Sequence, residues 1–193
     1  RDLREYISLL EEKGKLRTVK RTINKDTELN PLVKWQFRGL PERDWTGFLF
    51  ENLTDIKGKS YNCRVATSVL AASREMYALA MKCEPDRIHD TWRRAYQQPY
   101  TPRLVASGPA KEEIHYGDTL LQHGGLEEFA IPFSTNGWEA LPRLTAVSWH
   151  TKDPDTGIIN VGTYNGYVRL GPATSCRTCR SAGKEESLWK QSL

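Results

Sequence analysis

Long apolar runs and blocks of like charge are both absent from this chain. No stretch is long enough to cross a membrane, and no charged-then-apolar signal segment opens the sequence. The 28 Lys and Arg residues are interleaved with 24 acidic residues, so the net charge of +4 forms no basic tract. We therefore expect a cytoplasmic protein with neither membrane nor nucleic-acid partners.

Cysteine and histidine are scarce, with four of each. A disulfide framework is not expected without a secretory signal. Cys176 and Cys179 have the C-x-x-C spacing of zinc or redox sites, but a structural zinc site needs a second pair of ligands. His123 stands beside two glycines, where a loop histidine is the favoured interpretation and a metal ligand the alternative.

The composition is that of a globular protein. Of the 193 residues, 38% are hydrophobic and 27% are charged, with six Trp and eight Tyr. This length accommodates one large or two small domains. No internal repeat is present, which excludes a solenoid.

Four zones follow one another along the chain. Residues 1–98 alternate helix-like and strand-like segments and predict an α/β domain. Prolines at residues 99–111 mark a linker, residues 112–169 read as short strands and turns, and residues 170–193 form a polar tail with little periodicity. In the first zone, helices are expected at 2–14, 29–37, 73–80 and 86–96, and strands at 16–19, 47–50 and 64–67.

Three of the expected helices have recognisable start signals. Asp2 is placed as an N-cap and Gly14 as the stop of the first helix, and Ser73 and Asp86 are placed as N-caps of two later ones. The apolar face of the first helix follows the helical period at Leu3, Tyr6, Ile7 and Leu10. For such segments, packing is the expected role.

A β-hairpin is predicted at residues 145–164. Apolar and polar side chains alternate on both sides of Asp153–Gly157, the period of a half-buried strand. The intervening D-P-D-T-G favours a turn, because Pro presets one corner, Asp bonds its own backbone and Gly takes a positive φ. Asn160 is expected on the face opposite Ile159 and Val161, where its amide could coordinate a cation or a phosphate.

The hairpin resembles the UbiD family of decarboxylases, in which a strand after a D-P-x-T-G turn carries N-x-x-x-x-R. Asn160 matches the family's Asn, whereas Asn165 stands at the Arg position. The first helix, Phe50–Asn52 and Ser73–Glu75 are similar to further family segments. The resemblance covers roughly the first 168 residues.

The resemblance implies an α+β protein, in which an N-terminal α/β domain is followed by the beginning of a split β-barrel that binds flavin. The implied cofactors are prenylated flavin mononucleotide and a divalent metal, manganese or magnesium, with potassium as a further candidate. The implied cofactor-binding residues are Asn160, Gly162 and Thr163, and Asn160 is also the implied metal ligand.

The activity implied by the resemblance is reversible, non-oxidative decarboxylation of an aromatic or α,β-unsaturated carboxylic acid. A flavin prenyltransferase would supply the cofactor, and the family is homo-oligomeric. No catalytic residue is assigned, because Asn165 replaces the Arg, Arg169 is displaced along the strand, and the family's later glutamates have no counterpart. We hypothesise a truncated chain beyond about residue 169.

Two alternatives stay open at this point. The chain could be a non-catalytic flavin-binding or assembly subunit. The hairpin keeps the cofactor-binding Asn of the family signature at Asn160 but has Asn165 in place of the catalytic Arg. It could also be a structural fragment without a ligand, if the barrel does not close and leaves its edge strands exposed.

Overall fold

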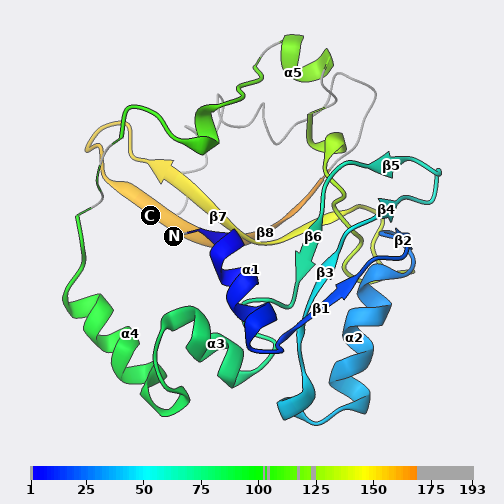
Figure 1. The fold of residues 1–193 in the computed structure, drawn as a ribbon. Helices are drawn as coiled ribbons and strands as arrows, with labels where there is room; N and C mark the ends of the chain where they lie inside the picture. The colour runs from blue at the N-terminus through cyan, green and yellow to red at the C-terminus, as the bar shows by residue number, and fades with distance from the viewer. Residues whose placement is uncertain (1, 102, 104, 117, 123–124, 169–193) are drawn as a thin grey trace. The chain divides into compact units, whose positions relative to one another are not determined.

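The computed structural model describes residues 2–101, 103, 105–116, 118–122 and 125–168 (Figure 1). Contacts between Cα atoms divide the chain into two units. The first unit comprises residues 1–23, 31–53 and 62–114. The second comprises, of the described chain, residues 24–30, 54–61, 115–116, 118–122 and 125–168. Helices and small mixed sheets are combined, so the predicted α+β class is confirmed.

The sheet of the first unit has the order β1-β3-β6, formed by β1 (Leu16–Val19), β3 (Gly47–Phe50) and β6 (Val65–Thr67). β1 runs parallel to β3 and β6 runs antiparallel to it. Close packing explains the glycine that begins β3, because a Cβ at Gly47 would lie 2.9 Å from the Val69 side chain.

Helix α1 (Leu3–Glu12) begins and ends as its capping residues predict. The Asp2 carboxylate accepts the backbone N–H of Arg4 at 2.9 Å and of Glu5 at 3.2 Å. These hydrogen bonds satisfy donors that a helix N-terminus leaves free. Gly14 has a φ of +66°, the left-handed conformation that favours glycine after a helix.

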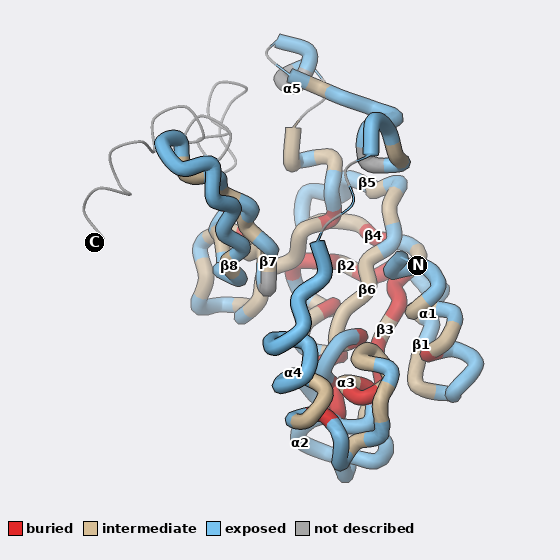
Figure 2. The backbone as a smooth tube through the Cα atoms, turned by 90° about the vertical axis from the view of Figure 1, so that its left-hand side faces the viewer, coloured by how far each residue is buried: buried red, intermediate tan, exposed pale blue. Residues whose placement is uncertain are grey.

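The core of the first unit lies between α1, the sheet and α3 (Arg74–Met81). Leu10 and Met76 are completely buried, and Figure 2 shows the buried colour along β3 and α3. The Tyr6 hydroxyl lies 2.9 Å from two carbonyl oxygens, those of Val69 and Met76, and its burial raises the pKa of Tyr6. The core cluster consists of Leu10, Val69, Ala72 and Met76, with Tyr6, Leu16, Trp45, Ala66 and Leu79 packed against it.

Two predicted N-caps have different outcomes. Ser73 caps α3, because its hydroxyl accepts the backbone N–H of Met76 at 3.2 Å. The prediction for Asp86 is wrong: α4 (Ile88–Gln97) has Arg87 at the N-cap position and no side-chain cap. A 3-10 turn, η2 (Pro85–Arg87), takes up Asp86, since a proline at the first position initiates that turn ahead of the helix.

A second small sheet, one further long helix and several short helical turns complete the described chain. A second sheet has the order β2-β4-β5, with the strands β2 (Ile23–Asn24), β4 (Leu53–Thr54) and β5 (Ser60–Tyr61). The remaining helical elements are α2 (Leu29–Gly39), η1 (Glu42–Asp44), η3 (Pro109–Lys111), α5 (Asp118–Gln122) and η4 (Gly125–Glu128).

The predicted hairpin is confirmed as an antiparallel pair, β7 (Arg143–Lys152) and β8 (Ile159–Tyr167). Within the described residues it is a two-stranded sheet, and Figure 2 draws most of it as exposed. The split barrel and the predicted domain boundaries therefore stay predictions. His123, Arg169, Cys176, Cys179 and the tail 170–193 lie outside the described residues.

Neither a membrane span nor a disulfide occurs in the described part of the chain. No helix there is long and apolar enough to cross a bilayer. Cys63 and Cys83 are both half-buried.

The two methionines provide a test of the first unit's core, because both lie in α3 but only Met76 is fully buried. We expect Met76→Ala to lower the free energy of unfolding by about 2–5 kcal/mol through the cavity it leaves. Met81→Ala, at a half-buried position of the same helix, should cost about 1 kcal/mol or less. Urea unfolding of both variants checks this, and equal losses would contradict the described core.

Candidate functional site

The turn of the hairpin is held by one carboxylate. Asp153 Oδ1 accepts the backbone N–H groups of Asp155 and Thr156, both at 2.8 Å. These hydrogen bonds, that from Thr156 first, lower the pKa of Asp153. Gly157 closes the turn with a φ of +71° and donates its N–H to the Asp153 carbonyl at 2.9 Å. The turn thus forms as its sequence predicts.

The strand register decides which residues share a face. Asn160 pairs with Thr151, and Gly162 pairs with Trp149. Because directly opposed residues of an antiparallel pair point to the same side, these four residues lie on one face of the hairpin. Thr163 is one position out of phase and lies on the other face. The structure therefore brings Asn160 and Gly162 together and turns the Thr163 side chain away from them.

Two aromatic side chains lie over the glycines of β8. A Cβ at Gly162 would overlap the ring of Tyr164, and one at Gly166 would lie 3.3 Å from the Trp149 ring. Trp149 Nε1 also donates to the Tyr164 carbonyl at 3.3 Å. The space beside Gly162 is consequently filled by Tyr164. A ligand would reach the backbone from this face only after that ring rotates.

Beside Asn160 lies a polar atom without a partner. The Thr151 hydroxyl is buried and makes no hydrogen bond in the part of the chain that the structure describes. An unmade hydrogen bond at a buried hydroxyl costs free energy. Asn160 is exposed, so its amide is accessible next to this hydroxyl. The pair offers two side-chain oxygens on one face of the hairpin.

These two oxygens do not amount to a metal site. Divalent magnesium takes about six oxygen ligands, whereas the described residues contain no cluster of three or more His, Cys, Asp or Glu side chains that could hold an ion. Asn160 could be one ligand of a larger set. The described residues alone do not complete that set.

A β-bulge interrupts the hairpin near its open end. Leu144 pairs with Gly166 and Val147 pairs with Tyr164, so two residues of β7 face the single residue Asn165. Bulges bend a strand and redirect its side chains, and they are frequent beside active sites. Asn165, the residue at the family's Arg position, thus lies at the one irregular point of the hairpin pairing.

The base of the hairpin is held by an ion pair that the sequence pattern does not single out. Arg143 Nη1 donates to Glu139 Oε1 at 2.8 Å, and the guanidinium lies 5.4 Å from the centre of the Tyr167 ring. Glu139 Oε2 accepts the backbone N–H of Ser134 at 2.9 Å and of Thr135 at 3.0 Å. The sequence hints at this ion pair only through the i, i+4 spacing of Glu139 and Arg143. That spacing predicts an ion pair only within a helix.

Hydrogen bonds favour the charged form of Glu139. Burial by itself would raise the pKa of this carboxyl, but the hydrogen bonds from Arg143, Thr135 and Ser134 outweigh burial and lower it. Glu139 therefore remains ionised at neutral pH and keeps the loop of residues 134–139 closed.

Comparison with known proteins yields structural matches only: no family model and no curated protein matches the chain. HmfF from Pelotomaculum thermopropionicum, a UbiD-class enzyme in complex with FMN, matches with a TM-score of 0.67 and 29% identity over 88% of this chain and 35% of its own. Vanillic acid decarboxylase from Sedimentibacter hydroxybenzoicus matches with a TM-score of 0.68 and 24% identity, over 85% and 35%.

The third comparison extends furthest along the chain. The 3,4-dihydroxybenzoic acid decarboxylase from Enterobacter cloacae matches with a TM-score of 0.70 and 21% identity, over 94% of this chain and 39% of its own. This chain is structurally similar to the N-terminal part of UbiD-class decarboxylases. It spans about 35% of the length of HmfF, the UbiD-class enzyme with the highest of the three identities.

The Glu139 ion pair predicts how stability depends on pH. Because the folded pKa lies below the ordinary value of 4.5, the carboxylate stabilises the fold above pH 4.5, and this contribution is lost as pH falls through the folded pKa. Glu139→Gln should cost about 1–3 kcal/mol at neutral pH, and the cost should shrink on acidification to about pH 3. Urea unfolding across this range measures it.

The matched control is Asp155→Asn, at an exposed carboxylate of the hairpin turn. It should leave the acid dependence of stability close to that of the unaltered protein. A Glu139→Gln cost that stays constant with pH would show that the carboxylate has no lowered pKa.

Proposed function

We propose that this chain provides the flavin-binding part of a UbiD-like decarboxylase that acts on an aromatic or α,β-unsaturated carboxylic acid. The observation that carries the proposal is the structural similarity to HmfF over 88% of the chain at 29% identity. The HmfF structures contain FMN in one case and prenylated FMN in a dimeric form in another. Similarity of fold alone would leave the function open, so the hairpin residues have to support it.

The hairpin supports a role in holding the cofactor. Asn160 presents an accessible amide beside the buried, unpartnered Thr151 hydroxyl, and together they suit a phosphate or one edge of a metal's ligand set. Gly162 and the backbone of Thr163 continue the same strand. Bound prenylated flavin would supply the electron sink for loss of carbon dioxide, while the protein would orient cofactor and substrate.

The proposal includes a split barrel, of which residues 112–169 form the first part. Ile159 and Val161 are 66% and 54% exposed on one face of β8. A two-stranded hairpin is marginally stable by itself, and further barrel strands would cover such a face. Manganese or magnesium, potassium, homo-oligomer formation and a flavin prenyltransferase as supplier are likewise proposed from the resemblance.

A non-catalytic flavin-binding or assembly subunit is the second candidate. One observation favours it: Asn165 occupies the position at which the family signature has its catalytic Arg. An amide carries no positive charge, so it could not stabilise the charge that an Arg stabilises. This candidate keeps cofactor binding and predicts no turnover.

Flavin retention tests the proposal directly. The whole chain is expressed together with a flavin prenyltransferase, purified with manganese, and examined by absorbance. We expect a bound flavin spectrum, and Asn160→Ala should reduce the flavin retained per protein by about tenfold, the effect of losing roughly one hydrogen bond to a charged group. Carbon dioxide release from an aromatic acid then separates the enzyme from the binding subunit.

Asn62→Ala is the matched control, because Asn62 is an exposed asparagine of the first unit and lies outside the hairpin. It should retain flavin as the unaltered chain does. If Asn160→Ala retains as much flavin as Asn62→Ala, the assignment of Asn160 fails. If no flavin binds at saturating cofactor and metal, both candidate functions fail.

A further inference from the structure

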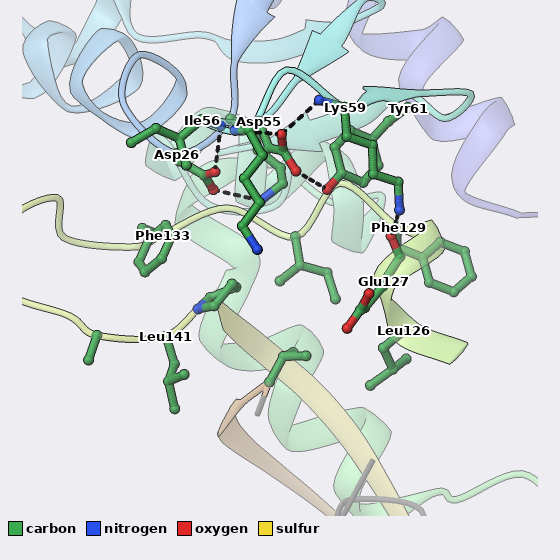
Figure 3. A pocket seen from close by; sticks show the side chains of 16 residues that line it. Asp26, Asp55, Ile56, Lys59, Tyr61, Leu126, Glu127, Phe129, Phe133 and Leu141 are labelled. Carbon is green, nitrogen blue, oxygen red and sulfur yellow. Dashed lines mark hydrogen bonds and ion pairs between the residues drawn. The ribbon is translucent and has the colours of Figure 1, made fainter. Parts of the chain in front are cut away.

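Each of the two units contains a cavity, and the charged walls of the two cavities differ. In the second unit the acidic side chains have partners within the protein (Figure 3). Asp55 Oδ2 accepts the Tyr61 hydroxyl at 3.0 Å, and Asp26 Oδ2 accepts the Ile56 N–H at 3.1 Å. The cavity of the first unit has a volume of about 270 Å³, and most of its charged side chains have no partner among the described residues.

One face of the sheet β1-β3-β6 forms the floor of the first unit's cavity. Thr18 of β1 pairs with Leu49 of β3, and both line the cavity. The Glu51 N–H donates to the Val19 carbonyl at 3.1 Å, which continues the parallel register by one residue beyond β1, to Lys20 and Glu51. Because strand side chains alternate, Lys20 and Glu51 lie on the same face as Thr18 and Leu49.

The third strand brings a second cation beside Glu51. β6 is antiparallel to β3, with Val65 opposite Phe50, so the next step places Arg64 opposite Glu51. Neighbouring strands lie about 4.8 Å apart, and Lys20, Glu51 and Arg64 therefore form a row of alternating charge across the sheet. All three line the cavity. Glu51 is half-buried, and none of the three side chains makes an ion pair or hydrogen bond with the described residues.

Helix α1 forms a second wall of the cavity. Its four lining residues are spaced as i, i+3, i+4 and i+7 and so share one face of the helix: Arg4, Ile7, Ser8 and Glu11. Arg4 is already paired, since its Nη1 lies 3.2 Å from Asp2 Oδ2. The Glu11 carboxylate has no such partner in the described chain.

The unpaired charges of the cavity are balanced in sign. Lys20 and Arg64 are cationic, and Glu11 and Glu51 are anionic. A purely anionic ligand would be repelled by the two carboxylates, and a purely cationic one by the lysine and the arginine. A ligand that carries both charges finds an opposite charge for each of its ends.

We propose that this cavity binds a small zwitterion, namely a free amino acid with an apolar side chain. The ligand's carboxylate accepts from Arg64, whose guanidinium offers paired donors, and its ammonium group donates to Glu51. Its side chain packs against Ile7 and the buried Leu49. The volume lies just below the range of about 300–1,000 Å³ for drug-sized ligands, which suits a smaller molecule. The site lies wholly in the first unit and goes beyond the cofactor role proposed for the hairpin.

Three probes of nearly equal shape test the ligand class. L-leucine, L-leucinamide, which lacks the carboxylate, and N-acetyl-L-leucine, which lacks the ammonium group, are titrated into the whole chain by isothermal calorimetry at neutral pH. We expect leucine to bind at least about tenfold more tightly than either analogue, because each analogue loses one charge-assisted interaction. An analogue that binds as tightly as leucine, or no saturable binding of leucine, overturns the proposal.

Two variants assign the ends of the ligand. Arg64→Gln and Glu51→Gln should each weaken leucine binding about tenfold. Arg64→Gln should also remove the preference for leucine over leucinamide, because the carboxylate then gains nothing. Glu51→Gln should likewise remove the preference for leucine over N-acetyl-leucine. Circular dichroism checks that both variants are folded, and unchanged leucine affinity in either folded variant contradicts the site.

The matched controls are Arg17→Gln and Glu12→Gln. Arg17 is an exposed residue of β1 whose side chain lies on the opposite face from Thr18, and Glu12 is an exposed residue of α1. Neither lines the cavity, so both variants should bind leucine as the unaltered chain does. A loss in either control equal to that of Arg64→Gln or Glu51→Gln would show that overall charge, and not this cavity, sets the affinity.

Discussion

The buried pair of Lys25 and Asp26 is the interaction on which the second unit depends. Every polar atom of Asp26 is used: the carboxylate bonds Lys25 and the Ile56 N–H, the backbone N–H donates to Asn24, and the carbonyl accepts the Asn136 side chain. One residue thereby joins three segments that are far apart in sequence. Removing one partner of a buried ion pair costs about 3–5 kcal/mol, because the other charge stays buried without compensation.

The segment that contains Asn136 leads directly into the hairpin. Beyond Asn136, the Glu139 carboxylate bonds two backbone N–H groups and Arg143, and the Arg143 N–H donates to the Pro132 carbonyl at 3.1 Å. Val168, directly after β8, donates to the Pro142 carbonyl at 2.9 Å. These hydrogen bonds connect the base of β7 and β8 to the segment that Asn136 attaches to Asp26.

The sequence predicts hydrogen bonds between residues a few positions apart, but it does not predict contacts between residues far apart in the chain. The Asp2 and Ser73 caps and the D-P-D-T-G turn follow from residues a few positions apart, which is why they could be predicted. The Asp86 cap failed because Pro85 starts a 3-10 turn first. The bond of Asn136 to Asp26 spans 110 residues, and no periodic pattern encodes such a contact.

Asp26→Ala, followed by native-state hydrogen exchange, tests this organisation most directly. If Asp26 assembles the second unit, the backbone amides of Ile56, Arg143 and Val168 should lose protection together. The Tyr77 amide in α3, bonded to the Ser73 carbonyl in the first unit, should keep its protection. Unchanged protection at Arg143 and Val168, or an equal loss at Tyr77, would show that Asp26 does not hold the second unit together.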